Sequence, residues 1–438
     1  MVQDVGGLQL REQPVDVRDL RAALALGNRL RLNGPMSSRG GTARLGPVDE
    51  LDLRPVFQPI VDLRDHSVVG YEALMRVGNG DGELRSAHDL LAAARREDSV
   101  AALDLAARDA ALRVADEHGL EPPFSLFLNV DPETLDASLP ELPANHRTHL
   151  IEVTEEALIA RPEAILRALT ELRSAGWGIA LDDVGADSRS LALMPVLYPD
   201  VIKLDLRLLA DRDPRDVARV VTAVAAEAER RHATVLAEGI DAEEQVALAR
   251  AYGATLGQGY LLGRPEALPD RLPAAGRPLR LPGAGGDPFG PTPWERVTNW
   301  QRPMRGSWRL GAQVVRVILQ RAADLGETAM VLVSLADEKY GEDSVKQFGW
   351  VRDYVAFIGI LNMGRPPERP GIRSGSLAPD DPLRGTGTLV ALAPGFSACF
   401  VVRDTGDGRT WEFATTYDRD TVVECALPLM ARMEPLPR

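Results

Sequence analysis

The segment "GIALDDVGADSRSL" (residues 178–191) decides how this 438-residue chain is interpreted. It opens with an apolar run, Ile179 to Leu181, that is typical of a short buried β-strand. The run ends on two adjacent carboxylates, Asp182 and Asp183. Because moving an unpaired charge out of water is strongly unfavourable, a buried strand does not end on two such groups unless cations face them. We therefore expect positive charge opposite the Asp pair.

Similar short apolar runs occur on both sides of this segment. Eight of them, between residues 54 and 265, alternate with helical stretches rich in Ala, Leu and Arg. This alternation predicts an α/β fold, a closed (β/α)8 barrel of the TIM-like kind. The first two runs, residues 55–63 and 67–77, are joined only by a turn at "RDHS". Strands without a crossover helix pair antiparallel, so we expect an antiparallel first pair.

Polar residues stand at the ends of these predicted strands. In β/α barrels the carboxyl ends of the strands converge on one face, so distant residues become neighbours there. Hard oxygen ligands in such a ring suit Mg²⁺ or Mn²⁺, and two ions can share a bridging carboxylate. None of the six histidines ends a predicted strand, which disfavours a zinc site. The strand-end residues are Glu72, Asn129, Glu152, Asp182, Asp183, Lys203, Asp205, Glu238 and Gln258.

Any one of these acids, taken alone, is more often a helix cap or a solvated loop charge. That interpretation does not explain why all of these residues occur together at strand ends. For Lys203 and Asp205 the structural alternative is a salt bridge across the strand end.

Composition divides the rest of the chain. Residues 1–49 have no sustained apolar period apart from a short predicted helix, and residues 267–291 are a Pro- and Gly-rich linker. Residues 292–438 predict a smaller α/β domain with five strands, two helices and an uncertain strand order. It contains five of the six tryptophans and both cysteines, Cys399 and Cys425.

Charge and cysteine content exclude several classes of protein. A net charge of −14 argues against binding DNA, RNA or an anionic membrane. No apolar run is long enough to span a bilayer, so we expect no membrane insertion. Two cysteines form no disulfide framework, and we expect a cytoplasmic protein with both thiols packed in its core.

Seven ordered motifs carry a resemblance that covers about residues 50–266. They are "YEALMR" (71–76), "LNV" (128–130), "IEVTE" (151–155), "LDDVG" (181–185), "IKLD" (202–205), "AEGI" (237–240) and "GQGYLLGRP" (257–265). In this order and spacing they resemble the EAL-domain phosphodiesterases, which open cyclic di-GMP to linear pGpG. The resemblance implies two divalent ions, Mg²⁺ or Mn²⁺, and a homodimer formed through the barrel.

The resemblance also implies roles for single residues. Glu238 would bind the second metal or act as general base, Lys203 would position the attacking water, and Glu155 would brace the loop after the fifth strand. Metal ligands would be Glu72, Asn129, Glu152, Asp182 and Asp183. Substrate contacts would come from Gln58, Leu74, Arg76, Asp205 and Gln258, with Arg76 at a phosphate and Gln58 at a guanine. Two structural alternatives stay open: a hydrogen bond at the bottom of the barrel for Gln58, and a surface ion pair for Arg76.

One departure from the family concerns the loop after the Asp pair. The family continues Phe-Gly-Thr-Gly-Tyr-Ser-Ser-Leu, whereas this chain has Val184, Ala186, Asp187 and Ser188 at the Phe, Thr, second Gly and Tyr positions. Replacing Gly restricts the backbone, although Asp tolerates left-handed angles better than most residues. Two hypotheses follow: a slow phosphodiesterase, or a silent barrel that binds cyclic di-GMP as a receptor. A scaffold that binds no nucleotide fits the carboxylate ring poorly.

Residues 292–438 resemble, in their pattern of elements, the DICT sensory domain found beside cyclic di-GMP enzymes. We expect this domain to regulate the barrel in response to an unidentified signal. Its tryptophans are candidates for lining a ligand pocket, although filling a small core is the more common role of each. They are Trp294, Trp300, Trp308, Trp350 and Trp411.

Overall fold

The computed structural model describes residues 51–78, 84–85, 87–131, 134–135, 147–185, 190–283, 285–336, 348–363, 370–406 and 410–436. Everything described belongs to one compact unit, residues 45–438. The short helix expected near the N-terminus lies outside the described residues. No helix in the described part of the chain has both the length and the apolar character needed to cross a membrane.

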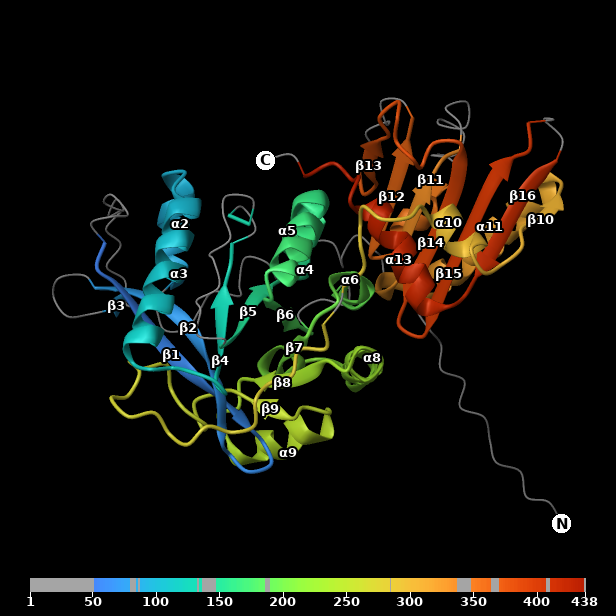
Figure 1. Ribbon diagram of the computed structural model, residues 1–438. Helices are drawn as coiled ribbons and strands as arrows, with labels where there is room; N and C mark the ends of the chain where they lie inside the picture. The colour runs from blue at the N-terminus through green and yellow to red at the C-terminus, as the bar shows by residue number, and fades with distance from the viewer. Residues whose placement is uncertain are drawn as a thin grey trace, which may run out of the picture. The chain divides into compact units, whose positions relative to one another are not determined.

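The first part of the chain forms the predicted closed barrel (Figure 1). Its sheet runs in the order β1-β9-β8-β7-β6-β5-β4-β2-β3 and closes through pairing of β1 with β2. The strands are β1 (Leu53–Asp62), β2 (Val68–Gly78), β3 (Leu84–Arg85), β4 (Ser125–Asn129), β5 (Thr148–Val153), β6 (Gly178–Val184), β7 (Val201–Asp205), β8 (Thr234–Glu238) and β9 (Leu256–Gly257). The α/β barrel expected from the sequence is confirmed.

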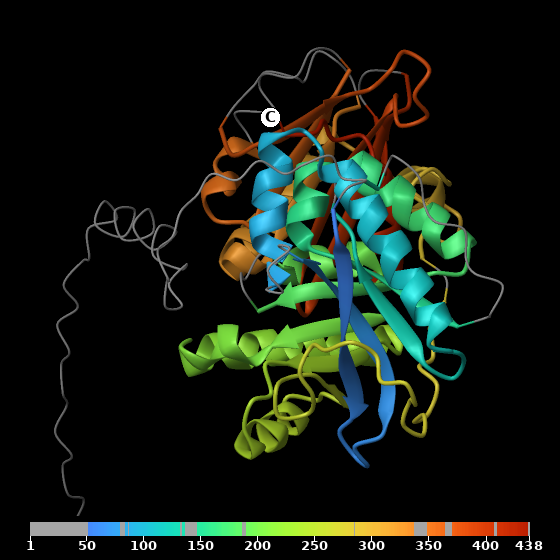
Figure 2. The same ribbon diagram turned by 90° about the vertical axis from the view of Figure 1, so that its left-hand side faces the viewer.

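The first strand pair is antiparallel, as expected. β1 and β2 form a long hairpin, seen as the blue pair in Figure 2, and their register places Gln58 opposite Glu72. β1 is also antiparallel to β9, whereas β2, β4, β5, β6, β7, β8 and β9 pair in parallel. Parallel strands bring their carboxyl ends to one edge, which is where the strand-end residues meet.

Helices cover the outside of the barrel, and apolar side chains fill its inside. Ile60, Phe127, Leu150 and Leu236 belong to the interior cluster, and Leu281 of the predicted linker packs against them. The helices are α2 (Ala87–Arg96), α3 (Val100–Glu117), α4 (Glu155–Ala160), α5 (Pro162–Ser174), α6 (Ser190–Leu197), α7 (Leu206–Ala210), α8 (Pro214–Arg231) and α9 (Glu243–Ala251). The interior is therefore a packed core, and the polar chemistry is confined to the strand ends.

The second part of the chain is a seven-stranded mixed sheet in the order β10-β16-β15-β14-β11-β12-β13. Side chains alternate along a strand, so one face packs with α11 and the other with α13. The strands are β10 (Met304–Gly306), β11 (Met330–Ser334), β12 (Phe357–Asn362), β13 (Arg373–Ser376), β14 (Thr386–Ala393), β15 (Phe396–Asp404) and β16 (Trp411–Thr416). The helices are α10 (Pro293–Thr298), α11 (Trp308–Leu325) and α13 (Arg419–Met430), with short 3₁₀ turns η2 (Gly326–Thr328) and η4 (Val351–Asp353).

Candidate active site

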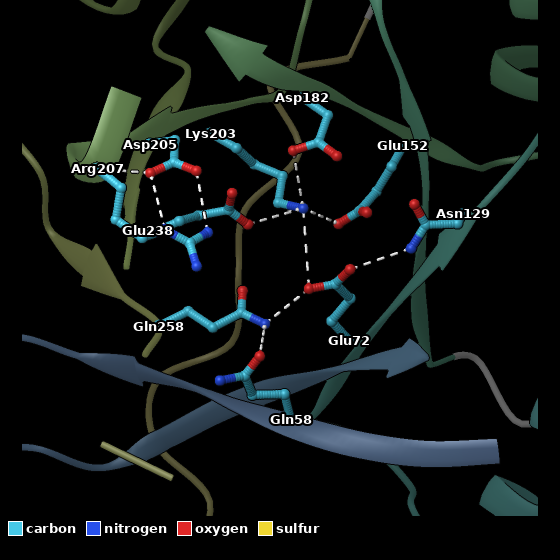
Figure 3. A network of polar contacts seen from close by, with 10 residues as sticks. All are labelled: Gln58, Glu72, Asn129, Glu152, Asp182, Lys203, Asp205, Arg207, Glu238 and Gln258. Carbon is cyan, nitrogen blue, oxygen red and sulfur yellow. Dashed lines mark hydrogen bonds and ion pairs between the residues drawn. The ribbon is translucent and has the colours of Figure 1, made fainter. Parts of the chain in front are cut away.

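A buried lysine lies at the centre of the strand-end residues. The Lys203 side chain is 1% exposed, and its Nζ lies 2.7 Å from Glu152 Oε1, 2.9 Å from Glu238 Oε1 and 3.0 Å from Asp182 Oδ1. A fourth carboxylate oxygen, Glu72 Oε2, is 3.8 Å away. Figure 3 shows these side chains converging from β2, β5, β6, β7 and β8. The cation expected opposite Asp182 is thus supplied, at least in part, by the protein.

Amide side chains fix Glu72 from two sides. Asn129 Nδ2 donates to Glu72 Oε1 at 3.0 Å, and Gln258 Nε2 donates to Glu72 Oε2 at 2.6 Å. Gln258 Nε2 also contacts Gln58 Oε1 at 3.0 Å, and Gln58 Nε2 donates to the Gly263 carbonyl. Gln58 therefore lies beside Glu72 and away from the bottom of the barrel. A carboxylate bonded on both oxygens cannot rotate freely, so Glu72 is held in one orientation.

The cluster carries more negative than positive charge. Four carboxylates face one ammonium, and burial raises the pKa of Glu238 to about 8 even though Lys203 opposes the shift. Burial, and then the neighbouring carboxylate of Glu72, raise the pKa of Glu152 well above its usual range. Burial alone would lower the pKa of Lys203, but Asp182, Glu152 and Glu238 raise it well above its usual value. Lys203 is therefore charged, and its single positive charge faces four carboxyl groups.

Asp183 lies beside this cluster without joining it. In the described part of the chain, the ion pairs of Lys203 involve four carboxylates, and Asp183 is not among them. The β6 register shifts between Leu181 and Val184, and Asp183 has a left-handed φ of +56°. Burial, and then the charge of Asp182, raise the pKa of Asp183 to about 6. The irregular strand end turns the two adjacent carboxylates in different directions.

The donor set fits a divalent cation in its chemistry. Carboxylate and amide oxygens are what Mg²⁺ and Mn²⁺ prefer, and both Glu152 oxygens and Asp182 Oδ1 accept no hydrogen bond of regular geometry. Among the residues described, however, no three acidic, His or Cys side chains surround a common point as metal ligands would. The reason is visible in Figure 3, where the Lys203 ammonium occupies the centre. A cation entering the site has to share these oxygens with Lys203.

Three other predicted site residues have contacts of their own. Asp205 caps α7 by accepting from the Arg207 backbone N–H at 2.7 Å, and its Oδ2 lies 3.0 Å from Arg207 Nη2. Arg76 Nη1 donates to the Met75 carbonyl at 2.8 Å. Glu155 Oε1 accepts a hydrogen bond from Ser190 Oγ at 2.5 Å. Asp205 thus pairs with Arg207, two residues further along the chain, and this contact is not the salt bridge across the strand end that was its structural alternative. Arg76 folds onto its own strand, and Glu155 bonds to the first residue of α6.

A cavity of about 600 Å³ opens beside the cluster. Predicted site residues on its wall are Leu74, Asn129, Glu152 and Asp182. Charged residues that the sequence reasoning missed also line it: Arg95, Asp104, Arg108, Glu156 and Arg161.

Two of these missed residues hold the chain segment that follows Asn129. Asp104 accepts from the Asp131 backbone N–H at 3.2 Å and from Thr134 Oγ1 at 2.5 Å, and its Oδ2 lies 3.0 Å from Arg108 Nη2. The only sequence signal for this pair was its i,i+4 spacing on a helix, which is common on exposed surfaces.

The C-terminal tryptophans do not gather at one site. Trp308 and Trp411, with ring centroids 5.3 Å apart, border a small cavity of about 60 Å³ beside α11. Trp294 is buried, with the Arg403 guanidinium 4.4 Å from its ring centroid, whereas Trp300 and Trp350 are exposed. The two cysteines are buried and free, as expected of packing residues. A hydrogen bond with Cys425 and burial raise the pKa of the Cys399 thiol well above its usual value.

Comparison with known proteins supports the resemblance to EAL domains that the sequence motifs of the first domain indicated. Residues 48–265 match the family model of the EAL domain. Cyclic di-GMP phosphodiesterase RocR of Pseudomonas aeruginosa is 32% identical over 157 residues, which are 33% of this chain and 40% of RocR. Cyclic di-GMP phosphodiesterase NbdA of the same organism is 35% identical over 117 residues, 26% of this chain and 15% of NbdA.

A solved structure, the calcium and cyclic di-GMP complex of Klebsiella pneumoniae BlrP1, aligns with 57% of this chain and 65% of BlrP1 at 30% identity and a TM-score of 0.44. The chain spans less than half the length of the first curated relatives it matches. The similarity to DICT domains expected for the C-terminal domain is not confirmed by these comparisons.

Proposed function

We propose that the barrel is a metal-dependent phosphodiesterase that hydrolyses cyclic di-GMP to linear pGpG, with the C-terminal domain as its regulator. The observation that carries the proposal is the buried Lys203, which faces four carboxylates at the edge of a cavity of about 600 Å³. The match of residues 48–265 to the EAL domain and the names of the relatives support the choice of substrate.

Glu72, Asn129, Glu152, Asp182, Asp183 and Glu238 would hold one or two divalent ions, Mg²⁺ or Mn²⁺. Such ions supply two things when bound: a water of lowered pKa, and positive charge beside the phosphodiester oxygens. The excess of carboxylates over Lys203 supports this assignment, as does Glu152 Oε2, which accepts no hydrogen bond of regular geometry.

The protein's own groups perform the remaining work. Glu238 accepts the proton of the attacking water at its carboxylate. The water oxygen bonds to phosphorus, the bond to the 3′ oxygen breaks, and that oxygen leaves as the hydroxyl of pGpG once it is protonated. Lys203 keeps the carboxylates together and would position the attacking water. Gln258 and Asn129 hold Glu72 still, which preserves the geometry of attack.

The alternative is a receptor that binds cyclic di-GMP without hydrolysis. Lys203 engages the same carboxylates that would bind the ions, and this contact favours the alternative. Incubating purified protein with cyclic di-GMP and Mn²⁺ or Mg²⁺ and separating the products distinguishes the two. Formation of pGpG by wild type, lost in Glu72→Ala and retained in the exposed control Glu244→Ala, supports the enzyme. Bound but unchanged cyclic di-GMP supports the receptor.

Two further expectations remain proposals. Association into a homodimer through the barrel is tested by light scattering across a range of protein concentrations. A cytoplasmic location is tested by fractionating cells that express the full chain.

A further inference from the structure

Helix α6 is enclosed on every side, which is unusual for an outer helix of a barrel. All eight of its residues, Ser190 to Leu197, are buried. A surface helix normally keeps one polar face toward water. Helix α13 of the C-terminal domain packs against α6, and buried residues of both helices belong to one hydrophobic cluster. The C-terminal domain therefore contacts the helix that follows the Asp182-bearing strand.

A balanced set of charges surrounds this contact. Glu227 of α8, only 2% exposed, lies 3.3 Å from Arg231 Nε and 3.6 Å from Arg419 Nη2 of α13. Arg231 Nη2 lies 3.2 Å from Asp420 Oδ1 of α13, and its guanidinium is 4.1 Å from the Tyr198 ring centroid. We call these four charged residues and the α6–α13 contact the joint.

The joint is connected to the carboxylate cluster through described residues. Ser190 opens α6, and its hydroxyl donates to Glu155 Oε1 at 2.5 Å. Glu155 is 5% exposed and opens α4, immediately after β5. Glu152 lies three residues earlier on β5 and contacts Lys203 at 2.7 Å. The Ser190–Glu155 bond therefore links the start of α6 to the chain segment that directly follows the strand end carrying Glu152.

We propose that α13 is a positioning element for the carboxylate cluster: by holding α6 in place, it sets the arrangement of Glu152 and Asp182 that receives a divalent cation. This inference rests on the proposed metal-dependent function and adds the route by which the C-terminal domain acts on it. Loosening the joint weakens Mn²⁺ binding although every ligand is present. If the joint only covers apolar surface, loosening it would lower thermal stability and leave Mn²⁺ affinity unchanged.

The test measures Mn²⁺ affinity directly, by electron paramagnetic resonance of the free ion in titrations of the full chain, so that no turnover is needed. Arg231→Met removes the central cation of the joint, and Ser190→Ala removes the bond to Glu155. Asp420→Asn is a milder change, because Asp420 is 56% exposed. Arg219→Met is the matched control, since Arg219 lies on the same helix α8 and pairs with Asp216.

We expect Arg231→Met and Ser190→Ala to weaken Mn²⁺ affinity by about two- to thirtyfold, the usual range for coupling through packed networks. Asp420→Asn is expected at the low end of this range, and Arg219→Met is expected to match wild type. If Arg231→Met, Ser190→Ala and Asp420→Asn all keep wild-type affinity while melting earlier, the proposal is overturned. A wild type that binds no Mn²⁺ overturns it too. A wild type that binds Mn²⁺ but forms no pGpG contradicts the proposed function alone.

Discussion

Two clusters of charge in this protein have opposite composition. At the barrel mouth, four carboxylates share one buried cation, Lys203. On the C-terminal sheet, one carboxylate, Glu412, lies between two arginines: its Oε1 is 3.0 Å from Arg305 Nη2 and its Oε2 is 2.7 Å from Arg403 Nη2. The pKa of Glu238 rises to about 8 in the first cluster, while hydrogen bonds from Arg403 and Arg305 lower the pKa of Glu412 in the second.

This difference in charge composition distinguishes a candidate functional site from ordinary ion pairs at the protein surface. In the Glu412 cluster the carboxylate is partly buried but both arginines are exposed, and ion pairs of exposed side chains add little to stability. The barrel cluster is buried and has four carboxyl groups around one cation, which costs free energy unless protons or a further cation neutralise them. Strongly shifted pKa values beside a cavity are typical of functional sites.

Removing Lys203 should have the largest effect. Lys203→Met leaves four buried carboxylates without their cation, and breaking a buried charge network in this way costs about 3–5 kcal/mol of folding free energy. Chemical denaturation of metal-free protein measures the change, and hydrolysis of cyclic di-GMP should fall to background in the same variant. An unfolding free energy equal to that of wild type would show that Lys203 is not the charge that holds the cluster.

Loosening Glu72 should have an intermediate effect on activity. Gln258→Ala removes one of the two amide donors that fix this carboxylate, and misplacement by about 1 Å can cost on the order of a hundredfold in rate. Initial rates of pGpG formation at saturating Mn²⁺ measure this. Gln245→Ala on the outer helix α9 serves as the matched control. An unchanged rate in Gln258→Ala would remove Gln258 from the site.

The raised pKa of Glu238 predicts a pH dependence of stability in the absence of metal. Its folded pKa of about 8 lies above the ordinary glutamate pKa of 4.5, so between these values the folded state binds more protons than the unfolded state. Stability from this group is therefore present below about pH 4.5 and declines as pH rises toward 8. Glu238→Gln does not titrate, so its melting temperature should exceed that of wild type by a margin that grows from pH 5 to pH 8. A constant margin would mean that Glu238 titrates normally.

Disturbing the Glu412 cluster should have the smallest effect. Arg305→Met leaves Arg403 in place beside Glu412, and the remaining groups are hydrated. We expect the melting temperature and the rate of hydrolysis to match those of wild type. A large loss in either measurement would break the contrast drawn between the two clusters.

Much of the barrel site was predictable, because its residues end apolar runs whose strands must meet at one edge. Glu152, Asp182 and Glu238 followed from this pattern. The antiparallel first pair was predictable from the short turn, but its register was not, and that register is what places Gln58 opposite Glu72. The central position of Lys203 was also not predictable. Alternation along a strand indicates on which face of the sheet a side chain lies, but it does not indicate which of several acids a long side chain contacts.

Contacts between segments far apart in the sequence were beyond prediction. Nothing in the apolar pattern of residues 419–433 indicated that α13 would pack against α6, because an apolar face shows that a helix is covered and not which distant element covers it. The same holds for Asp104 of α3, whose hydrogen bonds reach Asp131 and Thr134, about thirty residues further along the chain. The altered loop residues Ala186, Asp187 and Ser188 lie outside the described residues, so their effect stays a prediction.

The central claim is that this carboxylate cluster catalyses hydrolysis. The most direct measurement compares wild type with Asp182→Asn at saturating Mn²⁺, following cyclic di-GMP and pGpG by chromatography. Asn keeps the shape of the side chain and removes the charge that lies 3.0 Å from Lys203. The account predicts pGpG from wild type and a loss of about a hundredfold or more in the variant. Equal background hydrolysis in both proteins, with cyclic di-GMP still bound by wild type, would contradict it and make the protein a receptor.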